Sequence, residues 1–129
     1  MITYVDIDDF TRKYVTKRAE SLLKHDLERY HHELGEKLNG KSVLVIGGAG
    51  TIGSHYIKAI LRYHISRLVV VDINENGLTE LVRDLRSSTG YNIPQEFITY
   101  PMNFGDRVFE KMFVQLAPFD IVANFAAHK

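Results

Sequence analysis

Residues 41–61 read KSVLVIGGAGTIGSHYIKAIL, and this stretch decides the fold. A run of apolar and β-branched residues leads directly into four glycines, and the apolar spacing of an amphipathic helix follows at once. The first turn of a helix has unpaired N–H groups and a partial positive charge, so it attracts anions. A turn without side chains lets an anion reach those groups. The stretch therefore predicts a strand, an anion-binding turn and a helix.

The rest of the chain continues this alternation of strand and helix. The predicted strands are SVLVIG (42–47), RLVVVD (67–72), EFITY (96–100) and FDIVANF (119–125), and the predicted helices are Ile52–Tyr63, Glu75–Ser87 and Asp106–Leu116. Largely apolar strands indicate a parallel sheet covered on both faces, and right-handed crossovers then specify a doubly wound sheet. We predict that residues 41–129 form the N-terminal portion of an α/β dinucleotide-binding domain of the Rossmann type, with strand order 3-2-1-4.

Residues 1–40 are predicted to form a separate N-terminal helical segment. One long helix is expected from Asp8 to Leu38, with Asp8 or Asp9 as its cap and Asn39-Gly40 as its end. Its apolar residues recur at steps of three and four and form one stripe. They are Phe10, Tyr14, Leu22, Leu23, Leu27, Tyr30, Leu34 and Leu38. This helix either lies on the domain that follows or joins two copies of the chain; both interpretations remain open.

The glycines can be read in two spacings. Gly48, Gly50 and Gly53 give G-x-G-x-x-G, whereas Gly47, Gly50 and Gly53 give G-x-x-G-x-x-G. In a Rossmann turn the first glycine follows the last strand residue, here Ile46, so the second spacing is in register. We expect Gly47 to make the tight turn, Gly50 to admit a diphosphate, and Gly53 to let the helix close on the strand. A glycine turn with a structural role alone is the alternative.

An acidic residue stands where such a fold binds the adenosine ribose. Asp72 ends the second predicted strand, 19 residues after Gly53. Its carboxylate can accept hydrogen bonds from both ribose hydroxyls and would repel a 2′-phosphate. The following residues, INENG, contain no Arg or Lys that would offset this repulsion. The sequence therefore favours NAD over NADP as the cofactor.

Three segments of the chain together resemble a known family. VIGGAGTIGS, VVVDINENGL and the terminal FAAHK are similar to the N-terminal part of an extended short-chain dehydrogenase/reductase. The resemblance is to the nucleotide-sugar 4,6-dehydratase and epimerase branch of bacterial polysaccharide biosynthesis. It covers residues 41–129 and leaves the preceding helical segment unmatched. It implies an enzyme whose substrate is a nucleotide-diphosphate sugar. A cytoplasmic location is expected separately, from the acidic start of the chain and the lack of a long apolar run.

The resemblance also implies a set of cofactor-binding residues. They are Gly47, Gly50, Thr51, Ile52, Gly53, Asp72, Asn103, Phe104, Ala126 and Ala127. Asn103 and Phe104 match positions beside the adenine, where the family has an Asp and an apolar residue. The two small alanines match residues that let the cofactor lie over the end of the fourth strand, although the bulky Phe125 is expected near that path. His128 and Lys129 match the start of a run near the substrate.

Such enzymes oxidise the sugar at C4 by hydride transfer to NAD(P)+, with a Tyr base whose pKa is lowered by a Lys in a Tyr-x-x-x-Lys unit. None of the seven tyrosines here has a Lys four residues later, so no catalytic residue is assigned. We expect the chain to be a fragment that holds half of a site and is inactive alone. A non-catalytic dinucleotide-sensing module and another short-chain reductase are the alternative interpretations.

Composition excludes several other classes of function. Lys plus Arg equals Asp plus Glu at 16 each, so no overall field attracts nucleic acid. There is no Cys, and the six His residues show no metal-binding spacing. We expect neither a signal peptide nor a membrane span. The N-terminal helix and the exposed edge of the fourth strand are candidate surfaces for homo-oligomer formation.

Overall fold

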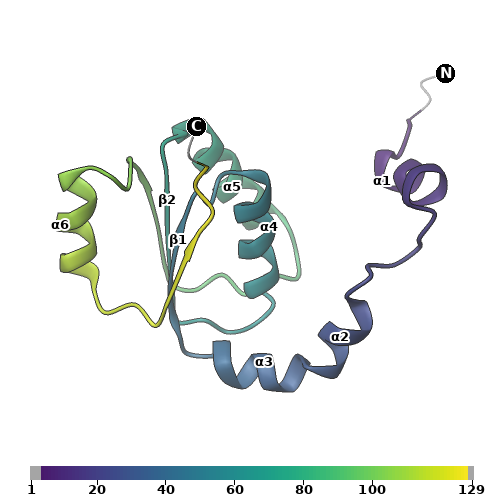
Figure 1. The fold of residues 1–129 in the computed structure, drawn as a ribbon, viewed down its shortest axis with the longest axis horizontal. Helices are drawn as coiled ribbons and strands as arrows, with labels where there is room; N and C mark the ends of the chain where they lie inside the picture. Colours follow the sequence, from purple (N-terminus) through teal and green to yellow (C-terminus); the bar gives the residue numbers. More distant parts are fainter. Residues whose placement is uncertain (1–3, 128–129) are drawn as a thin grey trace. The chain divides into compact units, whose positions relative to one another are not determined.

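A computed structural model describes residues 4–127 of the chain (Figure 1). It contains two compact units, Met1–Leu34 and Gly35–Lys129. The second unit holds a four-stranded sheet whose described strands are β1 (Ser42–Ile46), β2 (Arg67–Asp72), β3 (Glu96–Pro101) and β4 (Ile121–Asn124). All neighbours pair in parallel and the order is β3-β2-β1-β4, which confirms the predicted topology.

Three helices connect these strands and cover both faces of the sheet. They are α4 (Thr51–Ile60), α5 (Glu75–Ser87) and α6 (Arg107–Leu116). In Figure 1, α4 and α5 lie on one side of the sheet and α6 lies on the other. This is the arrangement that right-handed crossovers produce when the strand order reverses between β3 and β4.

Each face of the sheet has its own hydrophobic core. Side chains alternate between the two faces of a strand, so Val43 and Val45 of β1 face α4 and α5, whereas Leu44 and Ile46 face α6. The α4 and α5 side also holds the buried residues Ile57, Ile60, Leu61, Leu78, Leu81 and Leu85. On the opposite side Met112 of α6 is buried against β1 and β2. The two central strands are buried on both faces, as their uninterrupted apolar sequences predicted.

The outer strands are only partly covered. Within residues 4–127, β4 pairs with β1 alone, and its residues alternate between half-buried and exposed. Val122 of β4 is 51% exposed. The carboxyl ends of all four strands meet at one edge of the sheet, and the loops that follow β1, β2 and β4 leave from this edge side by side.

The single long helix expected from Asp8 to Leu38 is not formed. The segment instead contains α1 (Ile7–Phe10), a π-helix η1 (Thr11–Thr16), α2 (Lys24–Arg29) and α3 (His31–Leu38). Lys17 ends η1 with φ 55°, a left-handed conformation that a continuing helix does not allow. Helix stability in proteins comes mostly from packing of the apolar face, and none of these four described elements has a buried residue.

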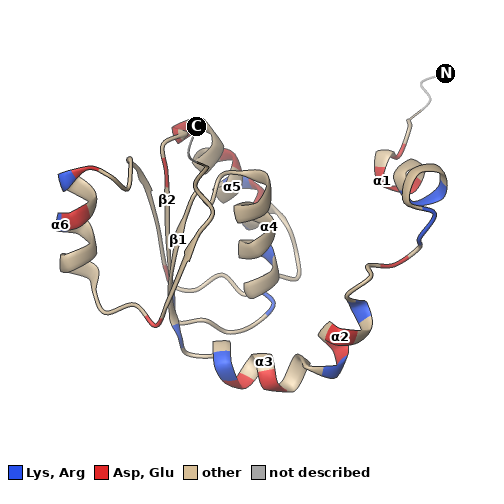
Figure 2. Ribbon diagram, in the orientation of Figure 1, with Lys and Arg blue, Asp and Glu red and all other residues tan. Residues whose placement is uncertain are grey.

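Of the two predicted ends of the helical segment, the start was wrong and the end is confirmed. Asp6, and not Asp8 or Asp9, caps the first helix, because its Oδ1 accepts a hydrogen bond from the Asp9 N–H at 3.0 Å. Gly40 does end α3 as predicted, with a positive φ of 76°. Acidic and basic residues are interspersed along the helices (Figure 2). In the part of the chain that the structure describes, no helix is long and apolar enough to cross a bilayer.

Candidate functional site

Gly47 is required by the backbone of the turn after β1. Its φ is 76°, and its N–H donates to the Val71 carbonyl at 2.7 Å. A Cβ atom added to Gly47 would lie 2.5 Å from the backbone nitrogen of Ala126, closer than any side chain tolerates. The turn therefore lies directly against the end of β4, and Gly47 makes the tight turn that the sequence predicted.

Gly53 and Gly48 are required by packing. An added Cβ on Gly53 would lie 2.2 Å from the Gly47 carbonyl oxygen, and one on Gly48 would lie 2.3 Å from Cγ1 of Val70. The first glycine allows helix α4 to close on the turn, as predicted. The second allows the turn to pass over the buried surface of β2.

Gly50 differs from the other three glycines of the turn. Its φ of −74° and ψ of 170° are open to any residue. Among the described residues outside its immediate neighbours, the one atom within 4 Å of an added Cβ is the Gly47 carbonyl oxygen at 3.5 Å, an ordinary contact. Nothing in the described chain therefore requires glycine at this position, and the space above it is open.

The start of helix α4 faces that open space. Gly50 is the N-cap residue, and within residues 4–127 no side chain caps the helix or adds a carboxylate to its first turn. The N–H groups of the first turn have no partner within a helix, and the helix dipole adds partial positive charge there. Thr51 and Ile52 are exposed beside them, Ile52 to 71%. This arrangement suits a bound anion.

Asp72 lies beside this turn, at the end of β2, and is half-buried. Its Oδ2 accepts a hydrogen bond from the Ala49 N–H at 2.9 Å, and its Oδ1 accepts one from the Asn74 N–H at 2.9 Å. A carboxylate oxygen can accept two hydrogen bonds, so each oxygen retains one acceptor position. The acid that the sequence singled out is thus in contact with the glycine turn.

Asn103 and Phe104 lie in the loop after β3. The Met102 N–H donates to the Asp72 carbonyl at 3.1 Å, which ties this loop to the end of β2. Asn103 accepts a hydrogen bond from the Gly105 N–H at 2.9 Å through Oδ1, so its side chain already shapes a local turn. Phe104 is 44% exposed. The structure therefore brings the loops after β2 and β3 together at one edge of the sheet.

Ala126 and Ala127 follow β4 and are exposed. The Ala126 N–H donates to Oδ1 of Asn124 at 3.0 Å, which turns the chain past Gly47. The ring of Phe125, expected near the cofactor path, instead packs against Tyr56 of α4 with 5.0 Å between ring centroids. The Phe125 side chain lies on the face of the sheet that α4 covers, because successive residues of a strand point to opposite faces. His128 and Lys129 lie outside the described residues.

Three further residues at this edge of the sheet were not predicted as site residues: Ile73, Asn74 and Gly77. The Oδ1 atom of Asn74 accepts from the Gly77 N–H at 3.0 Å and so caps α5. An added Cβ on Gly77 would lie 3.0 Å from Cβ of Ala49, so the first turn of α5 contacts the glycine turn. Ile73 is 76% exposed directly after Asp72. An Asn immediately before a helical pattern is a known capping signal and could have indicated Asn74.

Burial raises the pKa of Tyr56, whereas a Tyr base needs a lowered pKa. No group of three His, Asp or Glu side chains within residues 4–127 could hold a metal ion.

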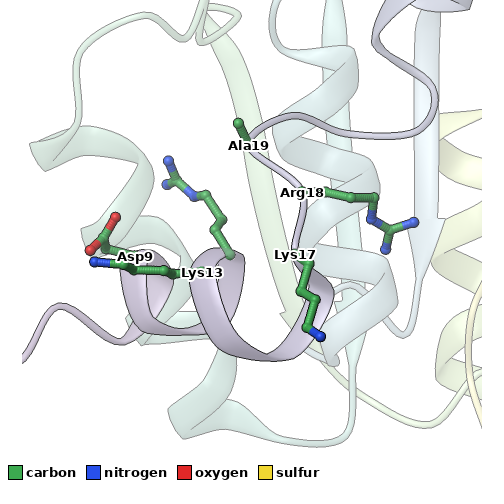
Figure 3. Close-up of a pocket in the computed structure, with 6 residues that line it drawn as sticks. Asp9, Lys13, Lys17, Arg18 and Ala19 are labelled. Carbon is green, nitrogen blue, oxygen red and sulfur yellow. The ribbon is translucent and has the colours of Figure 1, made fainter.

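The N-terminal unit contains a shallow hollow lined by Asp9, Arg12, Lys13, Lys17, Arg18 and Ala19. Figure 3 shows that Lys13 lies toward Asp9, whereas Lys17 and Arg18 extend in other directions. Charged side chains that bind one ligand converge on it, and these do not. We therefore place the candidate site at the carboxyl edge of the sheet.

The strand order, the glycine turn and the acid at the end of β2 define an α/β fold of the Rossmann type. Solved structures share this fold. The MalC reductase/Diels-Alderase from Malbranchea aurantiaca has a TM-score of 0.61 at 16% identity, covering 76% of this chain and 41% of that one. The protein gox2181 has a TM-score of 0.55 at 23% identity, covering 74% of this chain and 36% of that one.

The sequence comparisons identify the family. A family model described as polysaccharide biosynthesis protein matches residues 43–129, about two thirds of the chain, and the chain therefore belongs to this family. The probable polysaccharide biosynthesis protein EpsC of Bacillus subtilis is 29% identical over 99 residues, which are 75% of this chain and 16% of EpsC. The uncharacterized membrane protein MJ1061 of Methanocaldococcus jannaschii is 43% identical over 47 residues, which are 36% of this chain and 14% of that protein. The chain thus spans less than a fifth of either relative.

Proposed function

We propose that this chain binds NAD at the turn between β1 and α4, as the N-terminal portion of a nucleotide-sugar dehydratase or epimerase in polysaccharide biosynthesis. The observation that carries the proposal is Gly50. Packing or backbone conformation accounts for Gly47, Gly48 and Gly53, whereas Gly50 alone lies open to solvent at an uncapped helix start. A ligand group that approaches the backbone closely gives this position a reason to lack a side chain.

The diphosphate of the dinucleotide suits this position because it is an anion of the right kind. The first N–H groups of α4, at Thr51 and Ile52, would donate to its oxygens, and the helix dipole would favour its charge. Ile52 would provide an apolar cover on the exposed side. Ala126 and Ala127 are small and exposed, so they leave room above the end of β4.

The adenosine end of the cofactor would lie toward β2 and β3. Asp72 would accept hydrogen bonds from the ribose hydroxyls at the acceptor positions that its backbone partners leave open. Its negative charge disfavours the 2′-phosphate of NADP. Phe104 would contact the adenine, and the amide of Asn103 would hydrogen-bond its edge with the acceptor position that Gly105 leaves unused.

Membership in a polysaccharide biosynthesis family supports a nucleotide-linked sugar as the proposed substrate class. A bound NAD would supply a hydride acceptor for C4 of a nucleotide-linked sugar. The residues of this chain would hold and orient the cofactor; the Tyr-x-x-x-Lys unit of such enzymes has no counterpart in the sequence.

Calorimetric titration of NAD into the wild-type chain and into Gly50→Val tests the proposal. The backbone of Gly50 accommodates Val, so the variant should fold, which circular dichroism can check. We expect saturable binding to the wild type and at least roughly tenfold weaker binding to the variant, because the Val side chain would fill the diphosphate position. Equal affinities for NAD would contradict the proposal.

A further inference from the structure

We propose that Asp72 is a positioning residue for the diphosphate site as well as an acceptor for the ribose. This role rests on the function proposed above and extends it, because it makes the shape of the glycine turn depend on the carboxylate. A ligand that contains a diphosphate but no ribose would then also need Asp72.

The carboxylate of Asp72 joins two loops that are distant in the sequence. Oδ2 accepts from Ala49 in the turn after β1, and Oδ1 accepts from Asn74 in the turn after β2, both at 2.9 Å. Hydrogen bonds to an ionised acceptor are shorter and about twice as strong as those between neutral groups. Asp72 therefore holds the glycine turn at Ala49 by a strong bond that exists without any ligand.

Ala49 is held from a second direction by the first turn of α5. Its Cβ lies 3.0 Å from the position of a Cβ added to Gly77, so the methyl group rests on the Gly77 backbone. Gly77 in turn donates its N–H to Oδ1 of Asn74 at 3.0 Å. Ala49 is thus held between the carboxylate of Asp72 and the first turn of α5, which Asn74 caps and to which Gly77 belongs.

The position of Ala49 fixes the groups that would face a diphosphate. Ala49 directly precedes Gly50, the N-cap residue of α4, and the N–H groups of Thr51 and Ile52 follow. If Asp72 is removed, the Ala49 N–H loses its acceptor and the peptides around it can rotate. The helix start would then present its donors in several orientations instead of one, and anion affinity would fall because ordering the turn costs free energy.

The charge of Asp72 and its positioning bond should affect anion affinity in opposite directions, so a titration can distinguish them. Removal of a negative charge beside an anion site should by Coulomb's law strengthen anion binding. Loss of the positioning bond should weaken it. Glu75, in the exposed first turn of α5, offers a matched control, because Glu75→Gln removes a nearby charge without touching the Ala49 bond.

The experiment is a titration of inorganic pyrophosphate into the wild-type chain, Asp72→Ala, Asp72→Asn and Glu75→Gln, followed through the backbone amide resonances of Thr51 and Ile52. We expect Asp72→Ala to bind pyrophosphate roughly five- to tenfold more weakly than the wild type, because the anion must then order the turn that the lost bond had held. Asp72→Asn should lie between them because it keeps one acceptor oxygen. Glu75→Gln should bind as tightly as the wild type or more tightly.

Wild-type binding of both NAD and pyrophosphate, together with unchanged or tighter pyrophosphate binding in Asp72→Ala, would overturn the positioning role and leave the proposed function standing. A wild type that binds neither ligand would contradict both. If the Ala and Asn variants do not fold, amide hydrogen exchange in the ligand-free wild type tests the positioning role of Asp72 instead. The Ala49 amide should exchange markedly more slowly than that of Thr51, and equal rates would overturn the role.

Discussion

A Cβ atom added to Gly53 would lie 2.2 Å from the carbonyl oxygen of Gly47, so helix α4 rests directly on the backbone of the glycine turn. Gly50, three residues earlier, has only an ordinary contact at 3.5 Å. Two glycines of one motif are thus needed for different reasons. The fold requires Gly53, whereas a bound ligand would explain Gly50.

Gly53→Ala should therefore destabilise the chain, whereas Gly50→Ala should not. We expect Gly53→Ala to lower the free energy of unfolding by about 2–4 kcal/mol, because the backbone of Gly47 cannot move away without opening the turn. Gly50→Ala should leave it unchanged or raise it by roughly 0.5 kcal/mol, since Ala reduces the freedom of the unfolded chain. Urea denaturation measures both, and equal losses in the two variants would refute this division.

Asp72 should set the preference between the two dinucleotides. We expect the wild type to bind NAD more tightly than NADP, and Asp72→Ala to lose about 1–3 kcal/mol of NAD affinity through its missing hydrogen bonds. The same variant should lose less NADP affinity, because the repulsion of the 2′-phosphate is removed as well. Parallel calorimetric titrations give the four affinities. Tighter binding of NADP than of NAD by the wild type would show that the electrostatic argument is wrong.

Arg67 stabilises the loop between α6 and β4 at the other edge of the sheet. Its Nη2 donates to the carbonyls of Leu116 at 2.6 Å and Pro118 at 3.0 Å, and its guanidinium lies 4.5 Å from the ring centroid of Phe119. Arg67→Lys keeps the charge but not the planar group, so it should cost about 1–3 kcal/mol of unfolding free energy. Arg62→Lys, at an exposed position, is the matched control and should cost almost nothing.

The ion pair of Lys58 and Asp84 joins α4 to α5, with 2.6 Å between Nζ and Oδ2. A hydrogen bond with Asp84 raises the pKa of Lys58, and the same bond lowers the pKa of Asp84. The stability due to Asp84 is therefore fully present above its ordinary pKa of 3.8 and is lost as the pH falls through the lowered value. That due to Lys58 is present below 10.5 and is lost as the pH rises through the raised value.

Lys58→Gln tests this pH dependence. At neutral pH the variant should unfold at a lower urea concentration than the wild type, and the difference should shrink in strong acid and in high salt. The pair is partly exposed, so the effect should be small. A difference that stays constant from neutral pH to strong acid would show that Lys58 acts through its packing and not through its charge.

The sheet could be predicted from the sequence because its signals are local. Each central strand is an apolar run, and helix α5 was predicted with its observed bounds. The predicted fourth strand, 119–125, was too long, because β4 spans Ile121–Asn124, although the N–H groups of Asp120 and Phe125 still donate to the carbonyls of Ser42 and Ile46 in β1. Glycine spacing placed Gly47 and Gly53 correctly because their roles follow from position in a strand–turn–helix unit.

Other features depend on contacts that no local pattern reveals. The N-terminal helix breaks at Lys17, a residue with no intrinsic preference for the left-handed conformation. Leu38, at the end of its apolar stripe, packs against the core of the sheet, whereas Phe10, Tyr14, Leu22, Leu23, Leu27 and Tyr30 are exposed. The bond between Asp72 and Ala49 joins residues 23 positions apart. Sequence reasoning identified Asp72 as a ribose acceptor but could not show that its carboxylate also holds the glycine turn.

The most direct test of the central claim is a titration of NAD into the ¹⁵N-labelled chain, followed by the backbone amide resonances. We predict saturable shifts concentrated in residues 47–53, at Ala49 through Gly53 above all, with a second group around Asp72 and Asn103. Shifts that are absent, or that fall mainly in the N-terminal helices, would contradict dinucleotide binding at this turn.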